Sequence, residues 1–80
     1  MKTNAGYEIL LEAEYDRNDN GLVYSIVLGA KPDKSGFVTW DCKTDANGEK
    51  DYFWGHYHTS LKDAREDYIN RFRNEATHLI

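Results

Sequence analysis

Two histidines and the single cysteine are the residues of this chain whose types and spacing could do chemistry. His56 and His58 are separated by one residue, and such residues project from the same face of a β-strand. Two imidazoles on one face suit a metal ion, but a site needs a further ligand, for which Cys42 and His78 are the candidates. No zinc-binding spacing of cysteines and histidines occurs. We therefore expect structural roles for the histidines, and neither a metal site nor a cofactor.

Cys42 could instead act as a nucleophile, with His56 as its base. Such a pair needs a third group that orients the base and a glycine turn that stabilises an oxyanion, and neither stands out. No glycine-rich phosphate-binding motif occurs either. A small buried hydrophobe is the more ordinary role of a lone cysteine. We therefore predict no catalytic residue and interpret the protein as a non-enzyme.

Both histidines belong to residues 50–59, the most aromatic stretch of the chain, which reads KDYFWGHYHT. Aromatic residues favour strands, and here both faces of the strand would carry large rings. Ser60 follows as a good N-cap, and apolar residues at helical spacing then predict a helix over about residues 61–75. On that helix, Asp67 and Arg71 are spaced to pair with each other. The stripe predicted to face the sheet comprises Leu61, Ala64, Tyr68, Ile69, Phe72 and Ala76.

Three earlier segments also show the alternation of apolar and polar residues that is typical of strands. They cover residues 7–16, 22–30 and 37–44, and an Asn-Gly turn follows the first and the third. The sequence therefore predicts an α+β fold of two layers, formed by a single domain over residues 1–80. We expect a four-stranded antiparallel meander sheet with one C-terminal helix packed on one face (ββββα).

Alternation also assigns side chains to the two faces of the sheet. If Trp40 lies opposite Trp54, then Cys42 faces Tyr52, and all four lie on the side covered by the helix. His56 and His58, on the same face of their strand as Trp54, should lie on that side as well. The opposite face should then be open, mixing apolar groups with acidic ones. We expect on it Glu8, Leu10, Glu12, Glu14, Val23, Ser25, Val27, Phe37, Thr39, Asp41, Phe53 and Tyr57.

The composition excludes several classes of function. Fourteen acidic against ten basic residues give a net charge of −4, which disfavours direct binding of nucleic acid. No apolar run approaches the roughly 20 residues that span a bilayer, so we expect no membrane segment. With one cysteine no intrachain disulfide can form, which fits a reducing, cytoplasmic setting.

The acidic residues of the first strand are the most distinctive charge feature. Neighbours two apart in a strand lie roughly 6.6 Å from each other, and a one-sided row of carboxylates can occupy a basic groove built for nucleic acid. An ordinary solvated outer face is the alternative. Aromatic residues beside the acid favour an interface. The residues predicted to bind a partner are Glu8, Glu12, Glu14, Asp16, Phe37, Asp41, Phe53 and Tyr57.

In size, acidity and four-strand-plus-helix plan, the chain resembles small phage or mobile-element proteins that block host defence, such as anti-CRISPR proteins. That resemblance of plan implies a cytosolic, non-catalytic inhibitor that occludes a basic nucleic-acid-binding surface of a protein partner. A homodimeric structural or regulatory module, joined through Val27, Phe37 and Phe53, is the alternative. A metal- or thiol-dependent enzyme is the third hypothesis.

Overall fold

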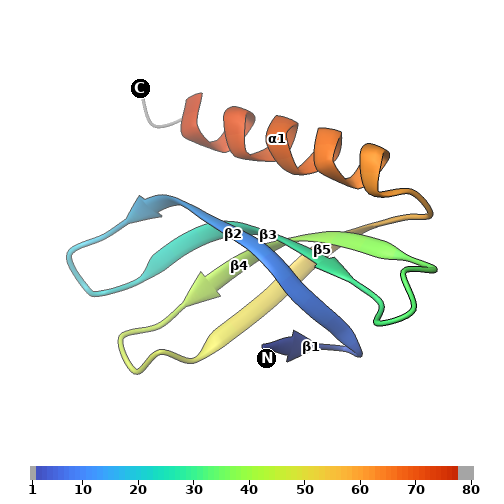
Figure 1. The fold of residues 1–80 in the computed structure, drawn as a ribbon. Coiled ribbons are helices and arrows are strands. Elements are labelled where there is room, and N and C mark those ends of the chain that lie inside the picture. The colour runs from blue at the N-terminus through green and yellow to red at the C-terminus, as the bar shows by residue number, and fades with distance from the viewer. Residues whose placement is uncertain (1, 78–80) are drawn as a thin grey trace.

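The computed structural model of the protein describes residues 2–77 and consists of a curved antiparallel sheet with one helix against it (Figure 1). The strands follow one another across the sheet in the order β1-β2-β3-β4-β5. The α+β class, the antiparallel meander and the C-terminal helix are as predicted. The elements are β1 (Thr3–Asn4), β2 (Tyr7–Arg17), β3 (Val23–Ala30), β4 (Phe37–Thr44), β5 (Lys50–His58) and α1 (Leu61–Thr77).

The prediction of four strands is wrong, because the start of the chain adds a fifth. Asn4 pairs with Tyr7 across a two-residue turn made of Ala5 and Gly6. Both turn residues have positive φ, at 51° and 83°, as tight hairpin turns require. Glycine adopts this conformation readily, but alanine rarely does. The turn therefore lacks the residue pair by which such hairpins are recognised in a sequence.

The β2–β3 and β4–β5 loops have the same structure, and both confirm the predicted Asn-Gly turns. Asn18 in the first loop and Asp45 in the second each accept two backbone N–H hydrogen bonds through Oδ1, at 2.9 to 3.1 Å. Gly21 and Gly48 supply φ values of 84° and 85°. Because both turns are held by contacts within five residues, local sequence is enough to specify them.

One face of the sheet packs against α1, mainly through β3 and β4. The cluster there contains Leu28, Ala30, Phe37 and Ala64. Because Phe37 belongs to it, β4 turns residues 37, 39 and 41 toward the helix, and the predicted assignment of the β4 faces is inverted. Alternation shows which residues share a face, but both faces of β4 carry large apolar side chains, so the pattern could not decide which one the helix covers.

The other face of the sheet is closed by its own curvature. Val27, Val38, Trp40 and Cys42 form a second buried cluster, although no helix covers this side. The sheet curves into half of a barrel (Figure 1). The cluster lies on its hollow side. The face that was expected to be open for docking is therefore the interior of a second small core.

Side chains from β2 and β5 meet over this second core, although two strands lie between them in the sheet. Lys50 Nζ on β5 is 2.9 Å from Glu12 Oε2 on β2. The rings of Tyr7 and Tyr57 have centroids 6.2 Å apart. Contacts between non-adjacent strands require strong curvature, and bulges in β2 and β5 supply it by increasing the local twist.

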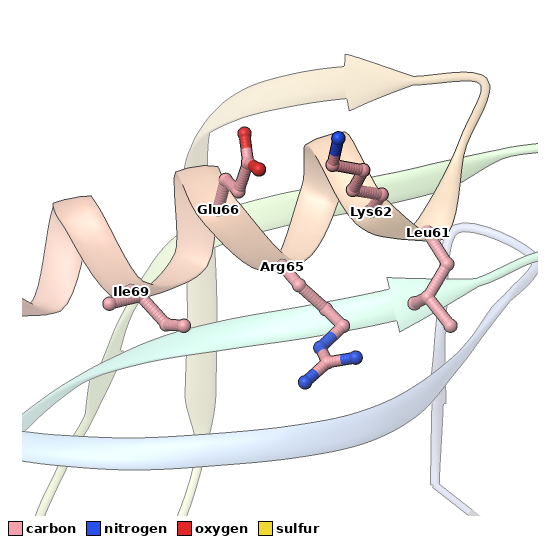
Figure 2. Close-up of a pocket in the computed structure, with 5 residues that line it drawn as sticks. All are labelled: Leu61, Lys62, Arg65, Glu66 and Ile69. Atoms are coloured by element: carbon pink, nitrogen blue, oxygen red, sulfur yellow. The ribbon is translucent and has the colours of Figure 1, made fainter.

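The helix begins as predicted, with the Asp63 N–H donating to Ser60 Oγ at 3.1 Å. Of its residues only Ala64 is fully buried. Leu61 and Ile69 were expected in the buried stripe but are 43% and 48% exposed, beside a hollow (Figure 2). This difference follows from the curvature, because a straight helix on a convex sheet touches the middle strands while the edge strands fall away.

Candidate functional site

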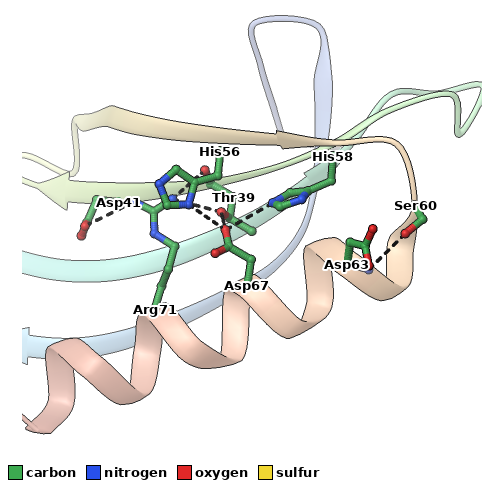
Figure 3. Close-up of polar contacts among 8 residues, drawn as sticks. All are labelled: Thr39, Asp41, His56, His58, Ser60, Asp63, Asp67 and Arg71. Atoms are coloured by element: carbon green, nitrogen blue, oxygen red, sulfur yellow. Dashed lines mark hydrogen bonds and ion pairs between the residues drawn. The ribbon is translucent and has the colours of Figure 1, made fainter.

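A polar network joins the helix to β4 and β5 (Figure 3). Oδ2 of Asp67 accepts a hydrogen bond from the Thr39 hydroxyl. The same oxygen lies 2.9 Å from His56 Nδ1 and 3.3 Å from His58 Nε2. The two histidines thus share the helix-covered face, as predicted. Asp67, which they both contact, was not among the predicted site residues.

Arg71 extends this network by one helical turn. Its Nη1 donates to the backbone carbonyl and to the hydroxyl oxygen of Thr39, both at 3.0 Å. Its Nη2 lies 3.6 Å from Oδ2 of Asp41, and the Tyr15 hydroxyl donates to the other oxygen of that carboxylate at 2.8 Å. The predicted pairing of Asp67 with Arg71 is wrong, because both side chains reach into the sheet instead.

The network is fully hydrogen-bonded, and its central carboxylate, Asp67, is kept ionised. Burial raises the pKa of Asp67, but hydrogen bonds from Thr39, His56 and His58 outweigh it and hold the pKa below its usual value. Among residues 2–77, no buried side-chain nitrogen or oxygen lacks a hydrogen-bond partner. Such complete pairing is typical of a structural clasp between two layers.

The candidate chemistry of His56, His58 and Cys42 finds no assembled site. Within residues 2–77, no three or more His, Cys, Asp or Glu side chains are placed to hold a metal ion. His78, the other proposed ligand, lies outside the described residues. Cys42 belongs to the core of the hollow side, so the sheet separates its thiol from His56 on the helix side. Burial also raises the pKa of the Cys42 thiol, which opposes formation of the thiolate.

The predicted one-sided row of carboxylates is broken by two bulges in β2. The register with β3 shifts at Leu10 and again at Tyr15. Glu8 pairs with Ala30 and therefore lies on the helix-covered face, whereas Glu12 lies on the hollow side with its bond to Lys50. Each bulge inserts an unpaired residue and so reverses the alternation beyond it. Glu12 and Glu14 therefore share the side away from the helix, as predicted, whereas Glu8 and Asp16 lie on the helix side.

Each glutamate of that segment also has a cationic neighbour. The opposite charges neutralise one another locally, so this part of the surface is not a continuous negative strip. Burial raises the pKa of Glu12, but hydrogen bonds from Lys50 and Ser25 outweigh it and keep the carboxylate ionised. The pairs are Glu8–Lys34 at 4.0 Å, Glu12–Lys50 at 2.9 Å and Glu14–Arg17 at 2.9 Å.

The remaining predicted partner-binding residues lie in different environments. Phe37 and Asp41 are 6% and 2% exposed beneath the helix, so their expected place on an open face is wrong. Phe53 pairs with Asp41 and so shares the helix-covered side of β5. Asp16 is half-buried beside the second β2 bulge. Tyr57 does lie on the side away from the helix, and 65% of it is exposed.

Trp54 is the exposed residue that alternation did not reveal. The strand β5 holds an extra residue between Phe53 and His56, so Trp54 leaves the ladder and is 71% exposed. The expected pairing of Cys42 with Tyr52 is confirmed, but Trp40 has no single residue opposite it. A register shift of this kind re-aims a side chain, and no local pattern in the sequence announces it.

The backbone at Trp54 has a φ of 53°, which is rare for a bulky residue. The next residue is Gly55, which would adopt a positive φ at no cost. Gly55 has another task, because a Cβ there would lie 3.0 Å from Trp40 Nε1 and 3.0 Å from the Tyr57 hydroxyl. Only glycine fits at position 55, because a side chain there would collide with Trp40 and Tyr57. The positive φ of the bulge therefore falls on Trp54.

These features define a two-layer α+β protein in which a five-stranded half-barrel carries one C-terminal helix. A comparison with family models, with curated proteins and with solved structures finds no match to the chain. Across residues 2–77, no helix has both the length and the apolar character needed to cross a membrane.

Proposed function

We propose that this protein is a non-catalytic binding protein that recognises a protein partner through the outward-facing aromatic residues of β5. Trp54 and Tyr57 are the most exposed of its large hydrophobic side chains among the described residues. Tryptophan and tyrosine are the residue types that most often dominate the energy of an interface. Phe53 packs edge-on against the Trp54 ring, with centroids 5.0 Å apart, and so limits its freedom before a partner binds.

The observation that carries the proposal is the strained backbone beneath an exposed ring. A residue held in such a conformation costs on the order of 1–3 kcal/mol, and strain of this kind clusters at binding sites. Burial cannot compensate it here, because Trp54 is exposed to solvent. A partner that covers the ring would supply the missing contacts.

The charge of the chain supports a basic partner. With a net charge of −4, the protein attracts a positively charged surface even though its glutamates are locally paired. The more specific proposal remains an inhibitor of host defence, of the anti-CRISPR kind, that occludes a basic nucleic-acid-binding surface. A cytoplasmic setting suits such an inhibitor and the lone buried cysteine.

The test compares two matched truncations of exposed apolar residues. Tagged wild-type protein, Trp54→Ala and Ile69→Ala are used to capture proteins from a lysate of the source cells, and the affinity for the captured partner is then measured with purified components. We expect Trp54→Ala to weaken binding by about 30-fold, as for an interface hot spot, and Ile69→Ala to leave it unchanged. Unchanged affinity of the Trp54 variant, with its circular dichroism spectrum intact, would refute the proposal.

A further inference from the structure

The outer edge of β5 is a series of backbone groups without a partner strand. This strand ends the sheet order, and among residues 2–77 it pairs only with β4. Every second residue of an edge strand directs its N–H and C=O groups away from the sheet, where water or another strand must bind them. Because β5 spans nine residues, Lys50–His58, this edge is long enough to pair with an extended segment.

The loop between β4 and β5 shows which residues in the first half of β5 face outward. The Asp45 N–H donates to the Glu49 carbonyl oxygen at 2.9 Å, which makes these two residues a hydrogen-bonded pair. Hydrogen-bonded and non-hydrogen-bonded pairs alternate along an antiparallel ladder. Counted from the loop, the pair of Cys42 and Tyr52 is non-hydrogen-bonded. The backbone N–H and C=O of Tyr52 therefore point away from the sheet.

The loop between β3 and β4 gives the same information for the second half of β5. The Lys31 N–H donates to the Gly36 carbonyl oxygen at 2.9 Å, so these residues are a hydrogen-bonded pair. Two residues further along β4, Val38 is again hydrogen-bonded to β3, opposite Gly29. Val38 thus directs its backbone groups away from β5. Tyr57, which lies opposite Val38, must direct its own N–H and C=O outward.

The bulge between these two tyrosines restricts what can pair with the edge. A long, flat edge pairs readily with copies of itself, and a bulge that twists the strand opposes this. The extra residue at Trp54 interrupts β5, so a partner segment must follow a twisted edge to reach both Tyr52 and Tyr57. The opposite edge of the sheet is less suited to pairing, because β1 covers the start of β2 and two bulges interrupt the rest.

Acidic side chains lie at the start of this edge. Glu49 and Asp51 are exposed, and within residues 2–77 neither takes part in an ion pair. Lys50 between them is engaged elsewhere, since its Nζ lies 2.9 Å from Glu12 Oε2. Lys43 lies opposite Asp51 in the ladder and offsets part of the negative charge. The remaining excess is complementary to a strand that carries lysine or arginine.

We propose that the outer edge of β5 binds an extended, basic segment of the partner protein, which joins the five-stranded sheet as an additional strand. The outward backbone groups of Tyr52 and Tyr57 hydrogen-bond to the segment, and its basic side chains lie beside Glu49 and Asp51. The exposed ring of Trp54 comes from the same strand and packs against the segment. This inference rests on the proposed function, because it names the form of partner that β5 recognises.

A peptide of defined sequence tests the edge directly. It is a synthetic peptide of about eight residues in which lysine alternates with valine, a strong strand former. A control peptide has proline in place of each valine, which keeps the charge but removes those backbone N–H donors. Nuclear magnetic resonance follows the exchange of individual amide protons of the protein with solvent.

Binding of the Lys-Val peptide should protect the two outward-facing amides. With this peptide at about ten times its Kd, the amides of Tyr52 and Tyr57 should exchange about tenfold more slowly, because they exchange only in the free protein. The Lys-Pro peptide should not slow them. A peptide in which glutamate alternates with valine should bind at least about tenfold more weakly than the Lys-Val peptide, because its charge matches that of Glu49 and Asp51.

A substitution at Tyr57 tests the same contact from the side of the protein. Tyr57→Pro removes one outward N–H, and an edge strand tolerates proline at such a position. It should weaken binding of the Lys-Val peptide about tenfold relative to Tyr57→Ala, which removes the ring and keeps the N–H. Thermal unfolding checks that both variants are folded, and the comparison of peptides on the wild-type protein does not depend on them.

Equal slowing by the Lys-Val and Lys-Pro peptides, or slowing by neither, would overturn the proposal. So would slower exchange of both amides when the protein alone is concentrated, because a second copy of the chain would then occupy the edge. Capture of a partner that depends on Trp54 would be unaffected by these results. Failure of strand addition can therefore be distinguished from failure of the proposed function.

Discussion

The two flanks of α1 are joined to the sheet in different ways. Toward β4 and β5, Asp67 and Arg71 bridge the distance to the strands with hydrogen bonds and ion pairs. Toward β2, Leu61 and Ile69 extend over the falling edge of the sheet and stay half exposed. Apolar burial beneath the helix is limited to a few residues around Ala64. Because hydrophobic burial is non-directional, it does little to fix the orientation of the helix on the sheet. The polar flank therefore sets the orientation of the helix, and the side chains of the apolar flank stay partly exposed.

The largest expected effect comes from breaking the polar flank at Arg71. Arg71→Ala leaves the carboxylate of Asp41 buried without its cation, and removing one partner of a buried pair costs about 3 kcal/mol. The same change at Arg65, on the apolar flank, should alter the free energy of unfolding by less than about 0.5 kcal/mol. Urea denaturation of both variants measures the two changes in the free energy of unfolding. Equal changes would show that Arg71 contributes no more to stability than Arg65 does.

A smaller effect is expected at Asp67, and it depends on pH. Because its pKa is lowered in the folded protein, its stabilising contribution is fully present above the ordinary aspartate value of about 3.9 and is lost as the pH falls through the lowered pKa. Asp67→Asn should therefore cost about 1–2 kcal/mol at pH 7 and less as the pH approaches 3. The matched change Glu66→Gln on the other flank should leave both quantities nearly unchanged.

The measurement for Asp67 is chemical denaturation from pH 3 to pH 7. The difference in the free energy of unfolding between Asp67→Asn and the wild type should shrink toward pH 3. A difference that is the same at every pH would contradict a stabilising role for the ionised Asp67 carboxylate. The other ionisable side chains in contact with Asp67 are His56 and His58.

The smallest expected effect is a gain in stability, and it concerns β5, whose His56 and His58 contact the polar flank of the helix. Trp54→Gly removes the strained φ of 53° and should raise the free energy of unfolding by up to about 1 kcal/mol, although the contact with Phe53 is lost. Thermal denaturation measures this change. A clear destabilisation would mean that the ring of Trp54 supports the fold and is not held out for a partner.

Contacts within a few residues explain the parts of the fold that the sequence predicted well. The cap at Ser60 and the Asn-Gly turns involve neighbours in the chain, so residue types alone are enough to indicate them. The alternating segments were correctly predicted as strands for the same reason. The turn at Ala5 was not, because it is made by a residue that rarely adopts its conformation.

The candidate site could be predicted only in part. Tyr57 was correctly placed on the side away from the helix, and the two histidines on the helix side. A clue to their partner was present, since Asp67 and Arg71 follow Ala64 at spacings of three and seven along one side of the helix. Polar residues beside a buried stripe can pair with each other or reach into the sheet, and the periodicity is the same in both cases.

By itself, the sequence determined the order and kind of the main elements, because propensity, capping and turn chemistry act between near neighbours. Only the tertiary structure decided which face of β4 meets the helix, how the bulges split the carboxylates of β2, and that Trp54 would be expelled from its ladder. All three depend on the curvature of the sheet, which arises where strands that are distant in the chain press against one another around Trp40.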